Sequence, residues 1–70
     1  MDKFLTIPDV AEILNVSVLQ VRSLLRSGDL KAIQIGGRGQ WRIQMSVLEE
    51  YVKHGYERTR ERVNSGWERR

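Results

Sequence analysis

The sequence predicts a small, mainly α-helical domain that contains one short β-hairpin, and three observations support this class. A helix start signal, in which a hydroxyl side chain precedes an acceptor side chain by three residues, occurs at Thr6, Ser17 and Ser46. Apolar residues recur at helical spacing after each signal. Between the second and third signals, a glycine-rich segment joins two short runs that have the character of hairpin strands.

Length and composition limit the chain to one small domain. It has 70 residues and no cysteine, so neither a disulfide nor a thiolate metal site can stabilise it. Its one histidine, His54, is too few for a multi-histidine metal site, and the residues around it lack the spacing of a hydrolase motif. We therefore expect no metal, no cofactor and no enzymatic activity.

No apolar run approaches the roughly 20 residues of a membrane span, and the N-terminal residues lack the basic-then-apolar pattern of a signal peptide. The sequence accordingly predicts a cytoplasmic protein that does not interact with a membrane.

The first helix is predicted to span about Ile7–Leu14. Thr6 and Asp9 are placed to form a reciprocal capping box, and Pro8 lies in the first turn, where its missing N–H costs nothing. Asn15 tolerates a left-handed backbone and is expected to end the helix. The positions expected to face the core are Val10, Ala11 and Leu14.

The second helix is predicted to follow the cap residue Ser17 and to run to about Ser27, with Gly28 as its stop. A tight corner of about two residues separates it from the first helix, which contains the small residue Ala11. This arrangement is a helix-turn-helix, in which the second helix is free to enter a DNA major groove. The residues expected to face inward are Val21, Leu24 and Leu25.

Residues 30–35 and 41–43 are expected to contain the two strands of the hairpin, joined by the glycine-rich loop 36–40. The loop is not a phosphate-binding P-loop, because no Gly-Lys-Ser/Thr follows it and no helix begins there. Trp41 is expected to pack at the base of the hairpin.

Ser46 is expected to cap a third helix from Val47 onward. Gly55 follows two cationic residues and is typical of a helix end, which would make His54 a surface residue at that end. An apolar stripe with helical spacing continues past Gly55, however, and glycine inside a helix costs only about 1 kcal/mol relative to alanine. We therefore expect the helix to continue to about Asn64. The stripe consists of Leu48, Val52, Tyr56, Val63 and Trp67.

The net charge of +3 and the pI of about 9.8 are typical of nucleic-acid-binding proteins, although many other proteins are as basic. Residues 1–35 carry four basic and four acidic side chains, whereas residues 57–70 carry five arginines and three glutamates. The basic excess therefore lies in the second half of the chain.

A series of short motifs follows one another in order along residues 4–53. The series consists of Phe4-Leu5-Thr6, residues 11–17, Val21, residues 24–32, Ile35-Gly36-Gly37, Trp41-Arg42-Ile43 and residues 48–51. It resembles the excisionase-type, MerR-like winged helix-turn-helix domains of phages and actinobacteria. The resemblance implies a winged helix-turn-helix DNA-binding domain in residues 1–55. Residues 56–70 would then be a charged C-terminal extension, helical to about residue 64.

The resemblance also implies that the second helix enters the major groove and that the hairpin wing lies against the backbone or the minor groove. The residues expected to face DNA are Val18, Leu19, Gln20, Arg22, Ser23, Arg26, Arg38, Gln40 and Arg42. Arginine can bind a guanine edge or a phosphate, and glutamine can bind adenine. Val18 and Leu19 stand where family members usually have polar residues, so they would contact thymine methyl groups or a neighbouring protomer.

The extension has two interpretations. It is either a solvated charged segment or a docking surface for a neighbouring protomer or a recombinase. In the second case the anchors are Tyr56, Val63 and Trp67.

The function implied by the resemblance is that of a phage excisionase, which binds adjacent DNA sites cooperatively, bends the DNA and promotes integrase-mediated prophage excision. Its partners would be double-stranded DNA, neighbouring protomers and a phage integrase. A small MerR-like transcriptional regulator or phage repressor is the alternative. A protein-interaction module or antitoxin with a basic binding face is a third possibility.

Overall fold

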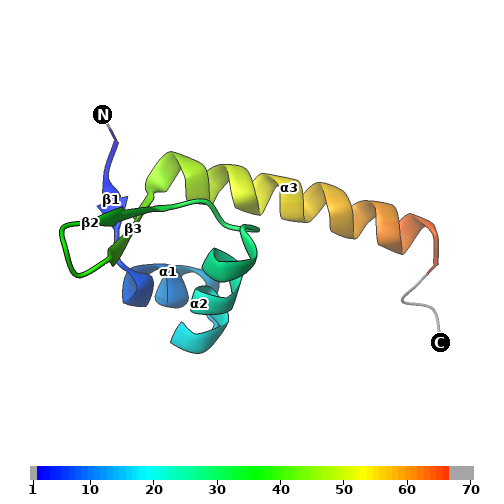
Figure 1. The fold of residues 1–70 in the computed structure, drawn as a ribbon. Coiled ribbons are helices and arrows are strands. Elements are labelled where there is room, and N and C mark those ends of the chain that lie inside the picture. The colour runs from blue at the N-terminus through cyan, green and yellow to red at the C-terminus, as the bar shows by residue number, and fades with distance from the viewer. Residues whose placement is uncertain (1, 67–70) are drawn as a thin grey trace.

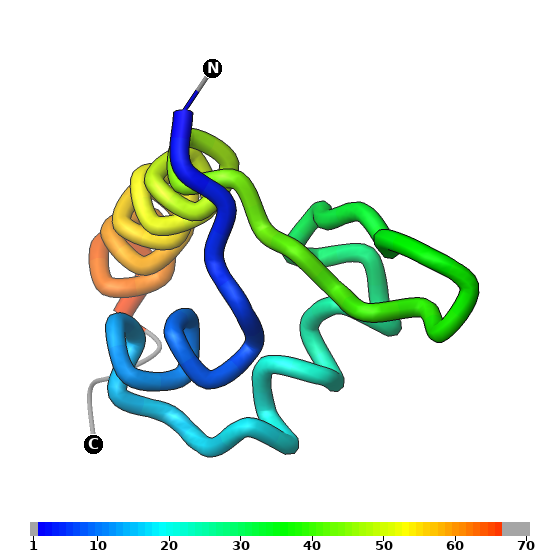
Figure 2. Tube along the Cα trace, turned by 90° about the vertical axis from the view of Figure 1, so that its left-hand side faces the viewer, coloured from blue at the N-terminus to red at the C-terminus, as the bar shows by residue number. Residues whose placement is uncertain are grey.

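A computed structural model describes residues 2–66 and shows three helices and three short strands (Figure 1). In chain order the elements are β1 (Phe4–Leu5), α1 (Ile7–Leu14), α2 (Val18–Ser27), β2 (Ile33–Ile35), β3 (Gln40–Gln44) and α3 (Met45–Asn64). The hairpin of β2 and β3 projects on the opposite side of the molecule from α3 (Figure 2). The predicted fold class, a mainly α winged helix-turn-helix with a long last helix, is confirmed.

The first two helices begin and end as their sequences predict. The Asp9 amide donates to Thr6 Oγ1 at 3.2 Å and the Thr6 amide donates to Asp9 Oδ2 at 3.0 Å, which completes the capping box of α1. The Gln20 amide donates to Ser17 Oγ at 3.1 Å at the start of α2. Both helices end at a residue with a left-handed backbone, Asn15 with φ 57° and Gly28 with φ 84°.

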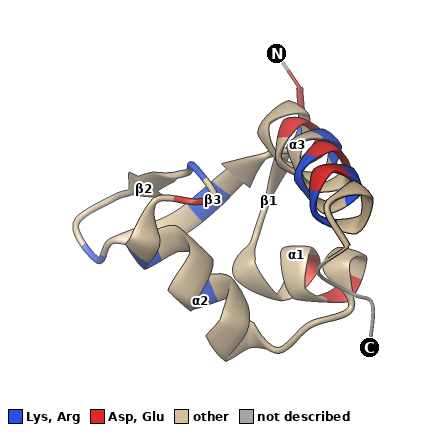
Figure 3. Cartoon of the chain, turned by 90° about the vertical axis from the view of Figure 1, so that its right-hand side faces the viewer, with Lys and Arg blue, Asp and Glu red and all other residues tan. Residues whose placement is uncertain are grey.

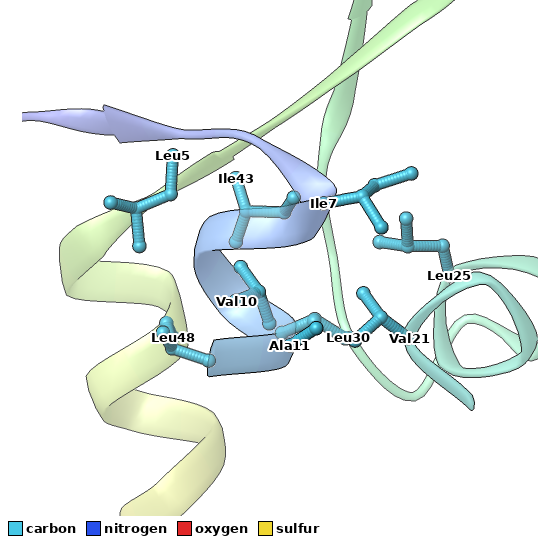
Figure 4. Close-up of a cluster of buried hydrophobic side chains, with 9 residues drawn as sticks. All are labelled: Leu5, Ile7, Val10, Ala11, Val21, Leu25, Leu30, Ile43 and Leu48. Carbon is cyan, nitrogen blue, oxygen red and sulfur yellow. The ribbon is translucent and has the colours of Figure 1, made fainter. Parts of the chain in front are cut away.

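One hydrophobic core joins all the elements except β2 (Figure 4). It is formed by Leu5, Ile7, Val10, Ala11, Val21, Leu25, Leu30, Ile43 and Leu48. Leu14 and Leu24, which the sequence places inward, are half-buried and pack against it, as does Trp41 at the base of the hairpin. The core therefore fixes α2 through one side only.

The sheet has a third strand that the sequence analysis missed. β3 lies in the centre and pairs antiparallel with β2 on one side and with β1 on the other. β1 is only two residues long, too short for an alternating pattern. The predicted hairpin boundaries also need correction. The first strand, Ile33–Ile35, is the second half of the predicted segment 30–35, whereas Gln40 belongs to β3, where it pairs with Ile35, rather than to the loop.

The predicted Ser46 cap of the third helix is wrong. α3 begins at Met45, and the Gln44 side chain at the N-cap position makes no capping hydrogen bond. The carboxylate of Asp2 takes this role instead, accepting from the Ser46 amide at 2.6 Å and from Gln44 Nε2 at 2.7 Å. These hydrogen bonds, above all the one from the Ser46 amide, lower the pKa of Asp2 below its ordinary value of 3.8.

α3 passes through Gly55 without a break and ends at Asn64, followed by Ser65 and by Gly66 with φ 86°. His54 is therefore not at a helix end. It lies in the middle of α3 on the surface, and its ring nitrogens are 3.2 Å from carboxylate oxygens of Glu50 and Glu57. The division between residues 1–55 and 56–70 falls inside this helix.

Candidate nucleic-acid interface

The outer face of α2 is exposed in the described chain. Val21 and Leu25 are buried in the core and Leu24 is half-buried, which orients the helix. The six side chains of α2 that the sequence analysis proposed to contact DNA are all exposed. They are Val18, Leu19, Gln20, Arg22, Ser23 and Arg26. Leu19 is the most open of the apolar pair, with 74% of its surface exposed.

These six residues do not point in the same direction. Each residue of an α-helix turns by about 100°, so the positions directly opposite the side formed by Val21, Leu25 and the half-buried Leu24 are Leu19 and Ser23, with Arg26 close to them. Arg22 lies on one edge of the helix, the edge that faces the hairpin, because it lines a cleft together with hairpin residues. Gln20 falls on the other edge.

The hairpin places its own polar side chains beside α2. Arg38 lies in the turn between β2 and β3, Gln40 begins β3 and is exposed, and Arg42 is half-buried further along β3. The Arg42 guanidinium donates to the backbone carbonyl of Trp41 at 2.7 Å, which holds the side chain in place. Gln34 Nε2 donates to the Gly39 carbonyl at 3.3 Å across the turn.

Arg22, Arg38 and Arg42 are brought together in one cleft of about 330 Å³. Its other lining residues are Thr6, Ile7, Pro8, Gly39, Gln40 and Trp41. The sequence analysis placed the arginines and Gln40 at the site but missed the contribution from the start of α1. No local signal marks it, because residues 6–8 reach the hairpin only through the tertiary fold.

The charged side chains that line this cleft are all positive. α2 carries arginines and no acidic residue, whereas acidic and basic residues alternate along α3 (Figure 3). The nearest acidic group on α1 is Asp9, whose pKa lies below its ordinary value of 3.8, chiefly because of hydrogen bonds with Thr6 and in smaller part because of Lys3 and Arg42. Its carboxylate is thus already engaged in the helix cap.

The second proposed surface lies on α3. Tyr56 is 76% exposed and Val63 is 49% exposed, and no other element within residues 2–66 covers them. A shallow hollow of about 300 Å³ beside Tyr56 is lined by Val52, Gly55 and Thr59. Trp67, the third proposed anchor, lies outside the described residues.

Comparisons with known proteins support the fold as a DNA-binding one. A family model described as a helix-turn-helix domain matches residues 4–56. No curated protein and no solved structure matches the chain. Between residues 2 and 66, none of the helices is long and apolar enough to cross a membrane. Because the match covers most of the 70 residues, the chain belongs to the helix-turn-helix domain family of DNA-binding proteins.

Proposed function

We propose that this protein is a phage excisionase that binds adjacent DNA sites, bends the DNA and favours integrase-mediated excision, without catalysis of its own. The family includes excisionase-like small DNA-binding proteins. The observation that carries the proposal is the exposed face of α2 beside an arginine-bearing wing, since the helix would lie in the major groove and the wing against the adjoining backbone.

The small size of this surface explains why several copies would act together. A single module of this kind buries about 600–1,000 Å² on DNA, and bending a site costs on the order of 1–6 kcal/mol. One α2 helix and one wing supply few contacts to offset that cost. Adjacent protomers that bind cooperatively share it.

The distal part of α3 supports such assembly. Tyr56 and Val63 lie seven residues apart on one side of the helix and are uncovered in the single chain. They would contact the next protomer or the integrase, together with Trp67. Lys53 and Arg60 lie along one flank of this stripe, where they would contact an acidic rim or DNA phosphate.

The test is an excision assay with a plasmid that carries the attachment sites, combined with footprinting of the same DNA. The intact chain should stimulate excision and protect adjacent direct repeats. The double variant Tyr56→Ser/Val63→Ser should bind a single site normally but lose cooperative protection and excision, whereas Glu61→Gln on the opposite side of α3 should behave as the intact chain. No stimulation of excision by the intact chain would refute the proposal.

A small MerR-like regulator or repressor is the second candidate, and the unbroken length of α3 favours it. Twenty residues of continuous helix with an exposed apolar stripe could pair two chains about a two-fold axis. Such a dimer would protect a palindrome rather than direct repeats. Footprinting and sedimentation of the free protein therefore distinguish the two functions.

A further inference from the structure

Three arginines from separate parts of the chain converge on a single cleft. Arg22 comes from the middle of α2, Arg38 from the hairpin turn and Arg42 from β3. They are neighbours in space only because α2 and β3 pack on the same core through Val21, Leu25 and Ile43. Arg26, one turn further along α2, is not part of the lining.

The lining of the cleft carries cations and no acidic group, and the nearby Asp9 carboxylate, which Arg42 attracts weakly, is already hydrogen-bonded in the cap of α1. Within residues 2–66, the side chains of Arg22 and Arg38 make no hydrogen bond or ion pair, and the Arg42 guanidinium donates only to a backbone carbonyl, which does not neutralise it. Like charges held close together repel one another, so this arrangement favours an anion between them. Planar guanidinium groups match the oxygen geometry of phosphate in particular.

We infer that this cleft holds the sugar–phosphate backbone of one DNA strand, and that Arg22 binds phosphate with Arg38 and Arg42 instead of reading a base. The inference rests on the proposed DNA binding of α2 and extends it. If α2 lies in the major groove and the hairpin lies beside it, the strand that borders the groove passes between them, which is where the cleft opens.

Base recognition is then left to the outermost residues of α2. Leu19, Ser23 and Arg26 follow one another at spacings of four and three, directly opposite the buried side of the helix. Leu19 would contact a thymine methyl group, Ser23 either kind of base, and Arg26 a guanine edge. The two arginines of α2 thus have different roles, although they are four residues apart on one helix.

Alanine variants of exposed arginines test this division. Binding of Arg22→Ala, Arg38→Ala and Arg26→Ala is measured by gel shift across a range of salt, on the footprinted site and on base-substituted copies of it. Arg58→Ala, on α3, is the control. Arg22→Ala and Arg38→Ala should each weaken binding to all of these DNAs equally, by about tenfold, and reduce the salt slope by about one. Arg26→Ala should instead lower the preference for the correct site by roughly 5- to 150-fold.

Neutral methylphosphonate linkages, placed one at a time in the site, locate the contact. A neutral linkage at the phosphate that the cleft holds should weaken DNA binding by the intact protein. The same linkage should hardly weaken binding by Arg22→Ala any further, since that variant has already lost the contact. For Arg38→Ala, the same or the adjacent linkage should have as little further effect on binding. Selective loss of site preference in Arg22→Ala would overturn the inference. The inference would also be overturned if Arg22→Ala became insensitive to a linkage on one strand and Arg38→Ala to a linkage on the other, because both arginines should contact the same strand.

Competition with inorganic phosphate tests whether the cleft binds a phosphate of DNA or a free anion. At equal ionic strength, phosphate should displace the DNA no better than chloride. Strong competition by phosphate, without any effect of the neutral linkages, would show a free-anion site and overturn the inference. A chain that shows the expected arginine pattern but stimulates no excision would refute the excisionase function alone. A chain that binds no DNA would refute both.

Discussion

α2 and the distal part of α3, residues 56–64, are helical segments of similar length that both carry arginines, but only α2 is covered on one side. Val21 and Leu25 of α2 are 0% and 6% exposed. No residue between positions 56 and 64 is buried. The difference lies in the presence of a partner element, since α2 packs against α1 and the distal part of α3 packs against nothing in the described chain.

This difference separates two sources of helix stability. The core holds α2 in one orientation, so its outer side chains are positioned before any ligand arrives. The distal part of α3 is too short to be a stable helix by itself, because isolated helices shorter than about 12–15 residues are marginal in water. It is helical because it extends the first half of α3, which Leu48 anchors in the core. Packing against the core thus stabilises α2, whereas the distal part of α3 is helical because it extends a helix that is already formed.

The largest effect is expected where α2 and the core meet. Leu30, which follows α2, is 1% exposed, and Leu30→Ala should lower the free energy of unfolding by about 2–5 kcal/mol through lost burial and a cavity. Leu19→Ala, on the open side of α2, is the matched control and should change it by less than about 0.5 kcal/mol. Urea denaturation followed by circular dichroism measures both, and equal losses would contradict the described burial.

Two glycines give opposite effects of intermediate size. Gly28 ends α2 with φ 84°, so Gly28→Ala should destabilise the protein by about 1–2 kcal/mol. Gly55 lies inside α3, and an added Cβ would meet nothing within 4 Å, so Gly55→Ala should stabilise it by about 0.8–1 kcal/mol. Melting temperatures of the two variants should therefore shift in opposite directions. A lower melting temperature for Gly55→Ala would mean that α3 does not continue through this position.

Acid should weaken the two side-chain caps. The pKa values of Asp2 and Asp9 are lower in the folded protein than their ordinary value of 3.8, so their stabilising contribution is complete above that pH and is lost as the pH falls through the lowered folded values. Asp2→Asn and Asp9→Asn should each flatten the decline in stability below about pH 4 in denaturation measured against pH. The control is Asp29→Asn, which removes a carboxylate that accepts no hydrogen bond from residues 2–66.

The smallest effect is expected on the uncovered side of α3. Val63→Ser should change the free energy of unfolding by less than about 0.5 kcal/mol, since the side chain is half exposed and no other element of the described chain covers it. Urea denaturation of the free protein checks this. A loss as large as that of Leu30→Ala would show that this part of α3 is covered in solution, for instance by a second copy.

The elements that the sequence predicted correctly depend on contacts between neighbours in the chain. The bonds between Thr6 and Asp9 and between Ser17 and Gln20 span three residues, so the residue types alone reveal them. The continuation of α3 through Gly55 was likewise predicted from the helical spacing of nearby residues in the chain, since one glycine costs a helix only about 1 kcal/mol.

The elements that the sequence analysis missed depend on contacts between distant residues. The Asp2 carboxylate caps α3 across 44 positions, and β1 exists only because Phe4 and Leu5 pair with the far end of β3. The Ser46 prediction failed for the same reason, since a residue far along the chain took the role that a local cap would have filled.

The candidate site also combines features that depend on neighbouring residues with features that depend on distant ones. By itself the sequence determined that α2 is an amphipathic helix with arginines on its polar side and that an arginine-bearing hairpin follows it, because residue types and short spacings encode both. Only the tertiary structure decided that Arg22 lies with the hairpin arginines while Arg26 does not. Arg22 and Arg26 point in nearly the same direction and differ by one turn along α2, so what matters is which turn lies beside the hairpin. That position is set by the core into which Val21 and Leu25 pack, which includes Leu5, Ile43 and Leu48 from distant parts of the chain.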